Sequence, residues 1–181
     1  MELIISGGDK AIADFAERLS PARLGMALSV AVNDTVRQVR REAGKEIAAH
    51  SSIKRRKVEE NIRMRYAAPG ALEGRVIASG RPLPLRDFNP SATRSGVTVK
   101  VWGKTQRYKG AFLVSKYGGN VYVRESASRL PIHKMFGAGI AQVMRQHETD
   151  HILLGYGRSR LEINVRRQLD RYSAGSGGVN R

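Results

Sequence analysis

Cysteine is absent from the 181-residue chain, which excludes a disulfide framework and any zinc site built on thiolates. No apolar run approaches the roughly 20 residues that a membrane-spanning helix needs, and residues 1–8 lack the basic and apolar segments of a signal peptide. The sequence therefore predicts a protein that is made in the cytoplasm, without disulfides and without a membrane partner.

Acidic residues are scarce: 16 Asp and Glu stand against 32 Lys and Arg, so the formal net charge is +16. Small soluble domains usually carry a net charge of about 2 to 8. The excess indicates an anionic partner or acidic neighbouring subunits, with a merely well-solvated surface as the alternative. Arginine outnumbers lysine 23 to 9 and suits both phosphates and subunit interfaces. Composition does not separate these two uses.

The length and the 41% of hydrophobic residues predict one α+β domain over residues 1–172, followed by a flexible Gly/Ser-rich tail over 173–181. Long N-terminal helices come first. Ser20 and Pro21 are a favourable helix start. Beyond them, apolar residues recur at spacings of three and four: Leu28, Val32, Val36, Val39, Ala43 and Ile47. This pattern predicts a helix over 21–48, preceded by a shorter one over 10–19.

A second helix is predicted over 53–66, and its first turn is unusual. Four cations, residues 54–57, stand where the positive end of the helix dipole favours Asp or Glu. A phosphate or an acidic subunit would relieve this conflict; alternatively, the helix begins one turn later and the cations lie in a solvated loop. The carboxylates of this helix are expected to pair one turn away: Glu59 with Arg55 or Arg63, and Glu60 with Arg56.

The middle of the chain predicts a small antiparallel sheet. Strands are indicated at 75–78 and by the alternation over 97–101, and a hairpin by 111–116 and 120–124 around a glycine-containing turn. Between the first two strands, 80–95 is rich in proline, glycine, asparagine and serine. That composition predicts a mobile loop, either an arm with a role or a surface insertion without one.

Helices are predicted to return after Pro131. Apolar residues share a face over 140–154, Gly155 and Gly157 interrupt the pattern, and a final helix is predicted over 161–172. Its arginines form another basic surface. The residues predicted to face DNA or a partner protein are Lys54, Arg55, Arg56, Lys57, Arg63, Arg65, Arg160, Arg166 and Arg167.

Residues 147–151, His-Glu-Thr-Asp-His, match the H-E-x-x-H pattern of zinc peptidases, in which two histidines bind the metal and the glutamate activates its water. A catalytic zinc needs a third protein ligand, and no histidine follows His151. Asp150 also places a charge inside the motif. The favoured interpretation is two histidines on the packing face of a helix, so neither a metal nor a catalytic residue is predicted.

Aromatic residues make up only 6% of the chain, but several fall in the predicted sheet, where they suit either base stacking or the sheet core: Trp102, Tyr108, Phe112, Tyr117 and Tyr122. No RNP signature, zinc finger or helix-turn-helix spacing is present. Any DNA contact is therefore expected to involve phosphates rather than base edges.

Several short motifs occur in a fixed order along the chain. A long Ala/Val-rich helix containing 30–33, Val-Ala-Val-Asn, precedes 53–58, Ile-Lys-Arg-Arg-Lys-Val; then come 109–112, Lys-Gly-Ala-Phe, 118–124, Gly-Gly-Asn-Val-Tyr-Val-Arg, 129–132, Arg-Leu-Pro-Ile, and 135–137, Met-Phe-Gly. Together these motifs cover roughly residues 22–145. In their order they resemble the prophage minor tail protein Z family.

The resemblance implies a structural virion protein of a long-tailed bacteriophage: a tail-completion protein at the head-proximal end of the tail, which joins tail to neck and positions the DNA end. It implies a homo-oligomeric ring, commonly a hexamer, in contact with other tail and neck proteins and with DNA phosphates as a further partner. It implies no catalytic residue, cofactor or small-molecule substrate. A free, sequence-independent DNA-binding protein is the alternative, and a zinc metallopeptidase ranks last.

Overall fold

The computed structural model describes residues 2–6, 19–101, 104–146 and 148–174, and it confirms the predicted α+β class. The chain divides into two compact units. Unit 1 comprises Met1–Glu42, Ile62–Ala78 and Asp150–Arg181, and unit 2 comprises Ala43–Asn61 and Ser79–Thr149. Because each unit is built from segments that are separated in the sequence, neither is a simple stretch of chain. That residues 1–172 fold as one domain stays a prediction.

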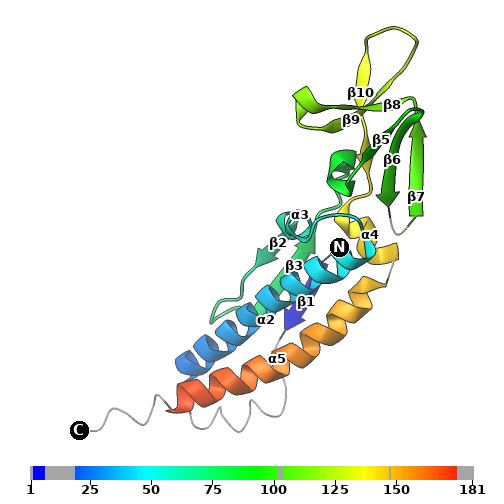
Figure 1. The fold of residues 1–181 in the computed structure, drawn as a ribbon. Helices are drawn as coiled ribbons and strands as arrows, with labels where there is room; N and C mark the ends of the chain where they lie inside the picture. Colours follow the sequence, from blue (N-terminus) through cyan, green and yellow to red (C-terminus); the bar gives the residue numbers. More distant parts are fainter. Residues whose placement is uncertain (1, 7–18, 102–103, 147, 175–181) are drawn as a thin grey trace. The chain divides into compact units, whose positions relative to one another are not determined.

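Two long helices dominate unit 1, α2 (Pro21–His50) and α5 (Thr149–Ala174), which lie side by side (Figure 1). The apolar stripe that predicted the first of them is buried along its whole length, through residue 42 in unit 1 and beyond it in unit 2. The predicted bounds, 21–48, are correct to within two residues. The shorter helix expected over 10–19 lies outside the described residues except for its last position.

The sheet of unit 1 is antiparallel, in the order β1 (Glu2–Ser6), β3 (Glu73–Ala78), β2 (Ile62–Arg65). Its inner face lies so close to α2 that a Cβ built on Gly74 would be 2.5 Å from Val36 Cγ2. Glycine is therefore needed where strand and helix approach. The prediction of helix through residue 66 was wrong, because Ile62 and Met64 alternate with arginines and pair with β3.

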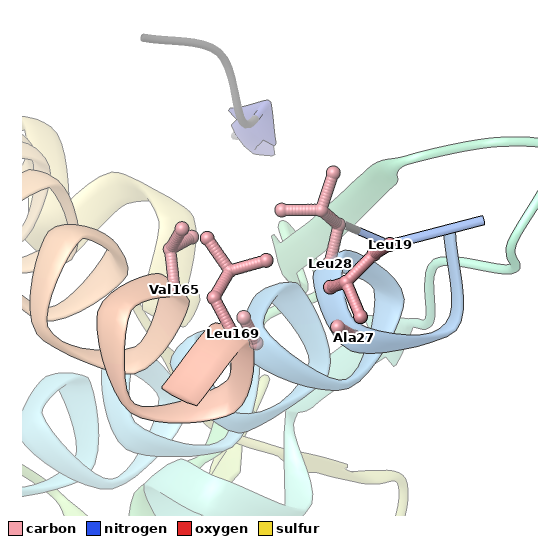
Figure 2. Packing of buried hydrophobic residues seen from close by; sticks show 6 residues of the cluster. Leu19, Ala27, Leu28, Val165 and Leu169 are labelled. Atoms are coloured by element: carbon pink, nitrogen blue, oxygen red, sulfur yellow. The ribbon is translucent and has the colours of Figure 1, made fainter. Parts of the chain in front are cut away.

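A hydrophobic cluster holds the two long helices of unit 1 together. Figure 2 shows Leu19, which precedes α2, together with Ala27 and Leu28 near the start of α2, facing Val165 and Leu169 of α5. The interruption predicted at Gly155 and Gly157 does not occur, since α5 runs through both.

The glycine at 157 serves packing. Gly157 is buried, and a Cβ built there would lie 3.4 Å from Val39 Cγ2 on α2. The helix also continues to Ala174, so the prediction of a flexible tail was wrong for residues 173 and 174; 175–181 lie outside the described residues. No helix in the described part of the chain is long and apolar enough to cross a membrane.

Unit 2 is built mainly from short strands. In chain order its elements after the end of α2 are α3 (Arg55–Glu60), β4 (Leu83–Pro84), η1 (Leu85–Phe88), β5 (Ser91–Thr93), β6 (Gly96–Val101), β7 (Lys104–Lys109), β8 (Ala111–Val114), η2 (Ser115–Tyr117), β9 (Asn120–Arg124), β10 (Ile132–Lys134), β11 (Phe136–Gly137) and α4 (Ile140–Gln146). The described residues of this unit form three antiparallel sheets, ordered β5-β6-β7, β10-β9-β8 and β11-β4.

The strand at 97–101 and the 111–124 hairpin are confirmed as β6, β8 and β9. The mobile loop predicted over 80–95 was wrong. It contains β4, η1 and β5, and its apolar side chains Leu83, Leu85 and Phe88 are buried. Helix also does not follow Pro131 at once, since β10 and β11 come first. Both errors have one cause: strands of two or three residues are too short to show a period.

Candidate nucleic-acid interface

The positive charge is concentrated in unit 2. Its segments contain 17 Lys and Arg against 6 Asp and Glu, a net charge of +11, whereas those of unit 1 contain 15 against 10, a net charge of +5. Between Asp87 and Glu125 the sequence has no acidic residue and seven cations. This acid-free stretch folds into β5 through β9.

One face of the β5-β6-β7 sheet collects hydroxyl groups and cations. The pairings Ser91 with Thr98 and Thr98 with Arg107 set the register, and alternate residues of a strand point to the same side. We call this the basic sheet face; its members are Ser91, Thr93, Thr98, Lys100, Thr105, Arg107 and Lys109, and all but the half-buried Thr98 are exposed. The opposite face carries buried Val97 and Val99.

The cations of the basic sheet face are available to a partner. Lys100, Arg107 and Lys109 have no ion pair within the part of the chain that the structure describes, and no carboxylate belongs to this sheet. Ammonium, guanidinium and hydroxyl donors on a flat surface suit phosphate oxygens. Contacts with phosphates contribute affinity but do not distinguish one base sequence from another. Binding of this kind is what the amino-acid sequence led us to expect.

The predicted cluster at 54–57 balances most of its own charge. The helix begins at Arg55, so the alternative in which it starts one turn later is wrong. Lys54 is the exposed N-cap residue and makes no side-chain capping bond. The expected intrahelical pairs are present, with one more: Arg55 Nε to Glu59 Oε1 at 2.7 Å, Arg56 Nε to Glu60 Oε1 at 3.1 Å and Lys57 Nζ to Glu60 Oε2 at 2.7 Å.

The ion pairs of α3 change the pKa of one of its carboxyl groups. The hydrogen bond from Lys57, followed by that from Arg56, lowers the pKa of Glu60 below its ordinary value. Two carboxylates pair with three of the four cations. The unfavourable interaction between these cations and the positive end of the helix dipole is therefore relieved within the chain itself. An external anion is therefore not required here.

Arg63 and Arg65 lie on β2 rather than on a helix, on the exposed side of the unit 1 sheet. Arg65 stands opposite Arg75 in the register, and Arg75 pairs with Glu73. Neither Arg63 nor Arg65 has an ion pair among the described residues. They form a second, smaller basic surface on unit 1.

The three predicted arginines of α5 have different roles. Arg167 pairs with Asp34 of α2 at 2.8 Å and so links the two long helices. Arg160 donates to the Tyr156 hydroxyl at 3.3 Å and lies over that ring. Arg166 is exposed and has no ion pair within the described chain. The sequence could not separate a structural arginine from a partner-facing one, because Asp34 is 133 residues from Arg167.

The H-E-x-x-H segment does not lie on one continuous helix. α4 ends at Gln146 and α5 begins at Thr149, while Glu148 has a left-handed backbone with φ of 49°. His151 and Leu154 are exposed, so the interpretation as a helix packing face was wrong for both. The described residues contain no group of three or more His, Cys, Asp or Glu placed to hold a metal ion.

The basic sheet face was missed by reasoning from motifs, although a simple signal was present. The 37 residues between Asp87 and Glu125 lack any carboxylate while carrying seven cations.

Comparison of the chain with protein-family models, with curated proteins and with solved structures finds no match.

Proposed function

We propose that the protein is a structural virion component, a minor tail or tail-completion protein of a long-tailed bacteriophage. In this proposal it is made in the host cytoplasm and assembles as a homo-oligomeric ring, a hexamer, at the head-proximal end of the tail. There it joins the tail to neck proteins and positions the DNA end, with phosphates contacted by the basic sheet face. No cofactor, metal or small-molecule substrate takes part.

The observation that supports this proposal is where the family-like motifs lie. The segments 109–112, 118–124, 129–132 and 135–137 all belong to unit 2, in β7 to β11 and the turns between them. This unit also carries the larger share of the positive charge and the basic sheet face. Of the remaining motifs, 53–58 also lies in unit 2 and 30–33 lies in unit 1, so most of the resemblance and most of the charge concern the same unit.

The usual structural reason for cations on a sheet accounts for only some of these residues. Lysines on edge strands prevent unwanted strand pairing, and β7 is an edge strand. However, Lys100 lies on β6, the central strand, where no free edge needs protection. Its outward charge, on the same face as Arg107 and Lys109, is better explained by an anionic partner.

A free, sequence-independent DNA-binding protein is the second candidate, favoured by the same face. It predicts that the isolated chain binds duplex DNA with a steep salt dependence, since every neutralised phosphate adds about 0.9 to the slope of log affinity against log salt. A ring component can instead require assembly before it contacts DNA. Duplex binding by the purified chain at physiological salt, together with normal virions in its absence, would favour this candidate.

Electron microscopy of particles from a phage lacking this gene tests the tail assignment. The expected result is tails that fail to give stable, DNA-filled, infectious particles; normal particles and titre would contradict it. Reversing Lys100, Arg107 and Lys109 together to Glu should reproduce part of the defect. The same reversal of Arg23, Arg41 and Arg158 is the matched control for net charge, because these exposed unit 1 arginines lie outside the predicted partner-facing set and change the charge by an equal amount.

A further inference from the structure

Three aromatic rings and a guanidinium form a row on the β8-β9-β10 sheet. The ring centroids of Tyr117 and Tyr122 are 6.1 Å apart, those of Tyr122 and Phe112 are 6.5 Å apart, and the Arg124 guanidinium carbon lies 4.5 Å from the centroid of Phe112. We call these four residues the aromatic row. Their neighbours in the register place Phe112, Tyr122 and Arg124 on one side of the sheet.

The aromatic row lies on the less buried face of this sheet; the same face also carries buried Asn120, and Leu113 and Val123 on the opposite face are half-buried. Ala111 and Val121, whose side chains point to the opposite side, are 5% and 0% exposed. Phe112 and Tyr122 are only half-buried, Arg124 is exposed, and Tyr117 is 55% exposed. A sheet that packs on one side normally turns polar residues outward on the other. Rings alongside a cation on that side therefore indicate a ligand with flat, apolar faces.

The turn that carries Tyr117 is held in place before any ligand arrives. Asn120 Nδ2 donates to the Tyr117 carbonyl at 2.5 Å, and Arg86 donates to the Gly118 carbonyl at 3.3 Å. Gly118 has a φ of 69°, which the tight turn requires and which glycine adopts freely. Tyr117 is thus presented at a defined place next to Tyr122.

The positive charge around the aromatic row indicates that its ligand is anionic. The aromatic row lies in the acid-free stretch between Asp87 and Glu125, and Lys116 and Lys134 add cations beside it. Glu125 follows Arg124 directly, and its Oε1 lies 2.8 Å from His133 Nε2, a contact that is an ion pair when His133 is protonated. Rings that alternate with cations suit a polymer that presents flat bases and phosphates at regular spacing.

We propose that the aromatic row binds single-stranded DNA, with bases stacked on Tyr117 and Tyr122 and phosphates held by Arg124 and the neighbouring lysines. A duplex would not serve, because its bases are stacked on one another and their faces are hidden. This inference goes beyond the proposed function. It concerns a different sheet from the basic sheet face, a different form of DNA, and base stacking in addition to phosphate contacts.

Fluorescence anisotropy with the full-length protein tests it, using labelled dT20 and a labelled 20-base-pair duplex at two salt concentrations. The protein is expected to bind dT20 more tightly than the duplex. Tyr117→Ala should weaken dT20 binding by about fivefold or more, the loss typical of one stacking residue, and leave duplex binding unchanged. Tyr117→Phe should restore binding, because the ring is kept.

Tyr66→Ala is the matched control, since Tyr66 is 50% exposed, close to the 55% of Tyr117, and belongs to unit 1. Arg124→Gln should lower the salt slope for dT20 by about 0.7, the value for one phosphate on a single strand. The proposal fails if dT20 binds no more tightly than the duplex, if Tyr117→Ala acts no differently from Tyr66→Ala, or if Tyr117→Phe loses as much as Tyr117→Ala. None of these results depends on virion assembly, so the tail assignment is judged separately.

Discussion

Units 1 and 2 handle their charges differently. In unit 1, Asp34 accepts hydrogen bonds from Arg37 at 2.6 Å, Arg167 at 2.8 Å and Gln168 at 3.1 Å, so one carboxylate ties α2 to α5. The hydrogen bond to Asp34 also raises the pKa of Arg37. In unit 2, the basic sheet face has three cations and no carboxylate. A count of arginines therefore does not locate an interface, whereas the distribution of their acidic partners does.

The largest expected effect concerns the core of unit 2. Phe88 is fully buried in the segment that composition alone identifies as a loop. Phe88→Ala should lower the free energy of unfolding by about 3–5 kcal/mol, because a large cavity is left. Denaturant unfolding measures this, with Phe136→Ala as the control, since Phe136 is 53% exposed and its loss should cost about 0.5 kcal/mol or less.

The Phe88→Ala variant also tests whether the two units unfold together as one domain. If residues 1–172 fold cooperatively, calorimetry of Phe88→Ala should give a single transition shifted to lower temperature. Two separated transitions, of which only one moves to lower temperature, would refute the single-domain prediction and show that the two units unfold independently.

A buried polar contact between α2 and α5 has the next largest effect. Asn164 Nδ2 donates to Thr35 Oγ1 at 2.9 Å and to Gln38 Oε1 at 3.2 Å, and Asn164 is 1% exposed. Asn164→Ala should destabilise the protein by about 1–3 kcal/mol, because the buried Thr35 Oγ1 keeps its bond to the Ala31 carbonyl but loses the donor that Asn164 supplies. Thermal melts measure the change. An unchanged melting temperature would mean that this contact contributes nothing to the helix pair.

Paired and unpaired cations should differ in what they change. Arg167→Gln should cost about 0–1 kcal/mol of stability, because the pair with Asp34 is partly exposed, and should leave DNA binding nearly constant. Arg107→Gln should leave stability nearly constant and lower the salt slope of duplex binding by about 0.9. Equal effects of the two variants on the salt slope would show that the paired Arg167 and the unpaired Arg107 contribute alike to DNA binding.

The smallest effect is a pH dependence in α3. Since the folded-state pKa of Glu60 is lowered, mainly by Lys57 and then by Arg56, this carboxylate stabilises the fold above its ordinary pKa. The contribution is lost as the pH falls from about 4.3, the ordinary value for glutamate, through the lowered value. The stability difference between the natural protein and Glu60→Gln should therefore shrink on acidification. A difference that grows instead would show that the pairs of α3 do not persist in solution.

Long periodic patterns were sufficient to predict some elements. The stripe of Leu28, Val32 and Val36 identified α2 because a helix that buries one face must repeat its apolar residues every three or four positions. Alternation over 97–101 identified β6 for the same kind of reason. The ion pairs of α3 were also foreseen, since residues four apart on a helix are neighbours whatever the rest of the fold does.

Local patterns were thus sufficient to predict the α+β class, the main helix, the hairpin and the ion pairs of α3, and the composition gave the large positive charge. Long-range contacts were needed to show that residues 62–65 form a strand, that α5 continues through two glycines, and that Phe88 lies in a core. They were also needed to show which arginines are paired. The physical reason is that each of these outcomes depends on residues far away in the chain: β3 pairs with β2, Val39 lies against Gly157, and Asp34 binds Arg167.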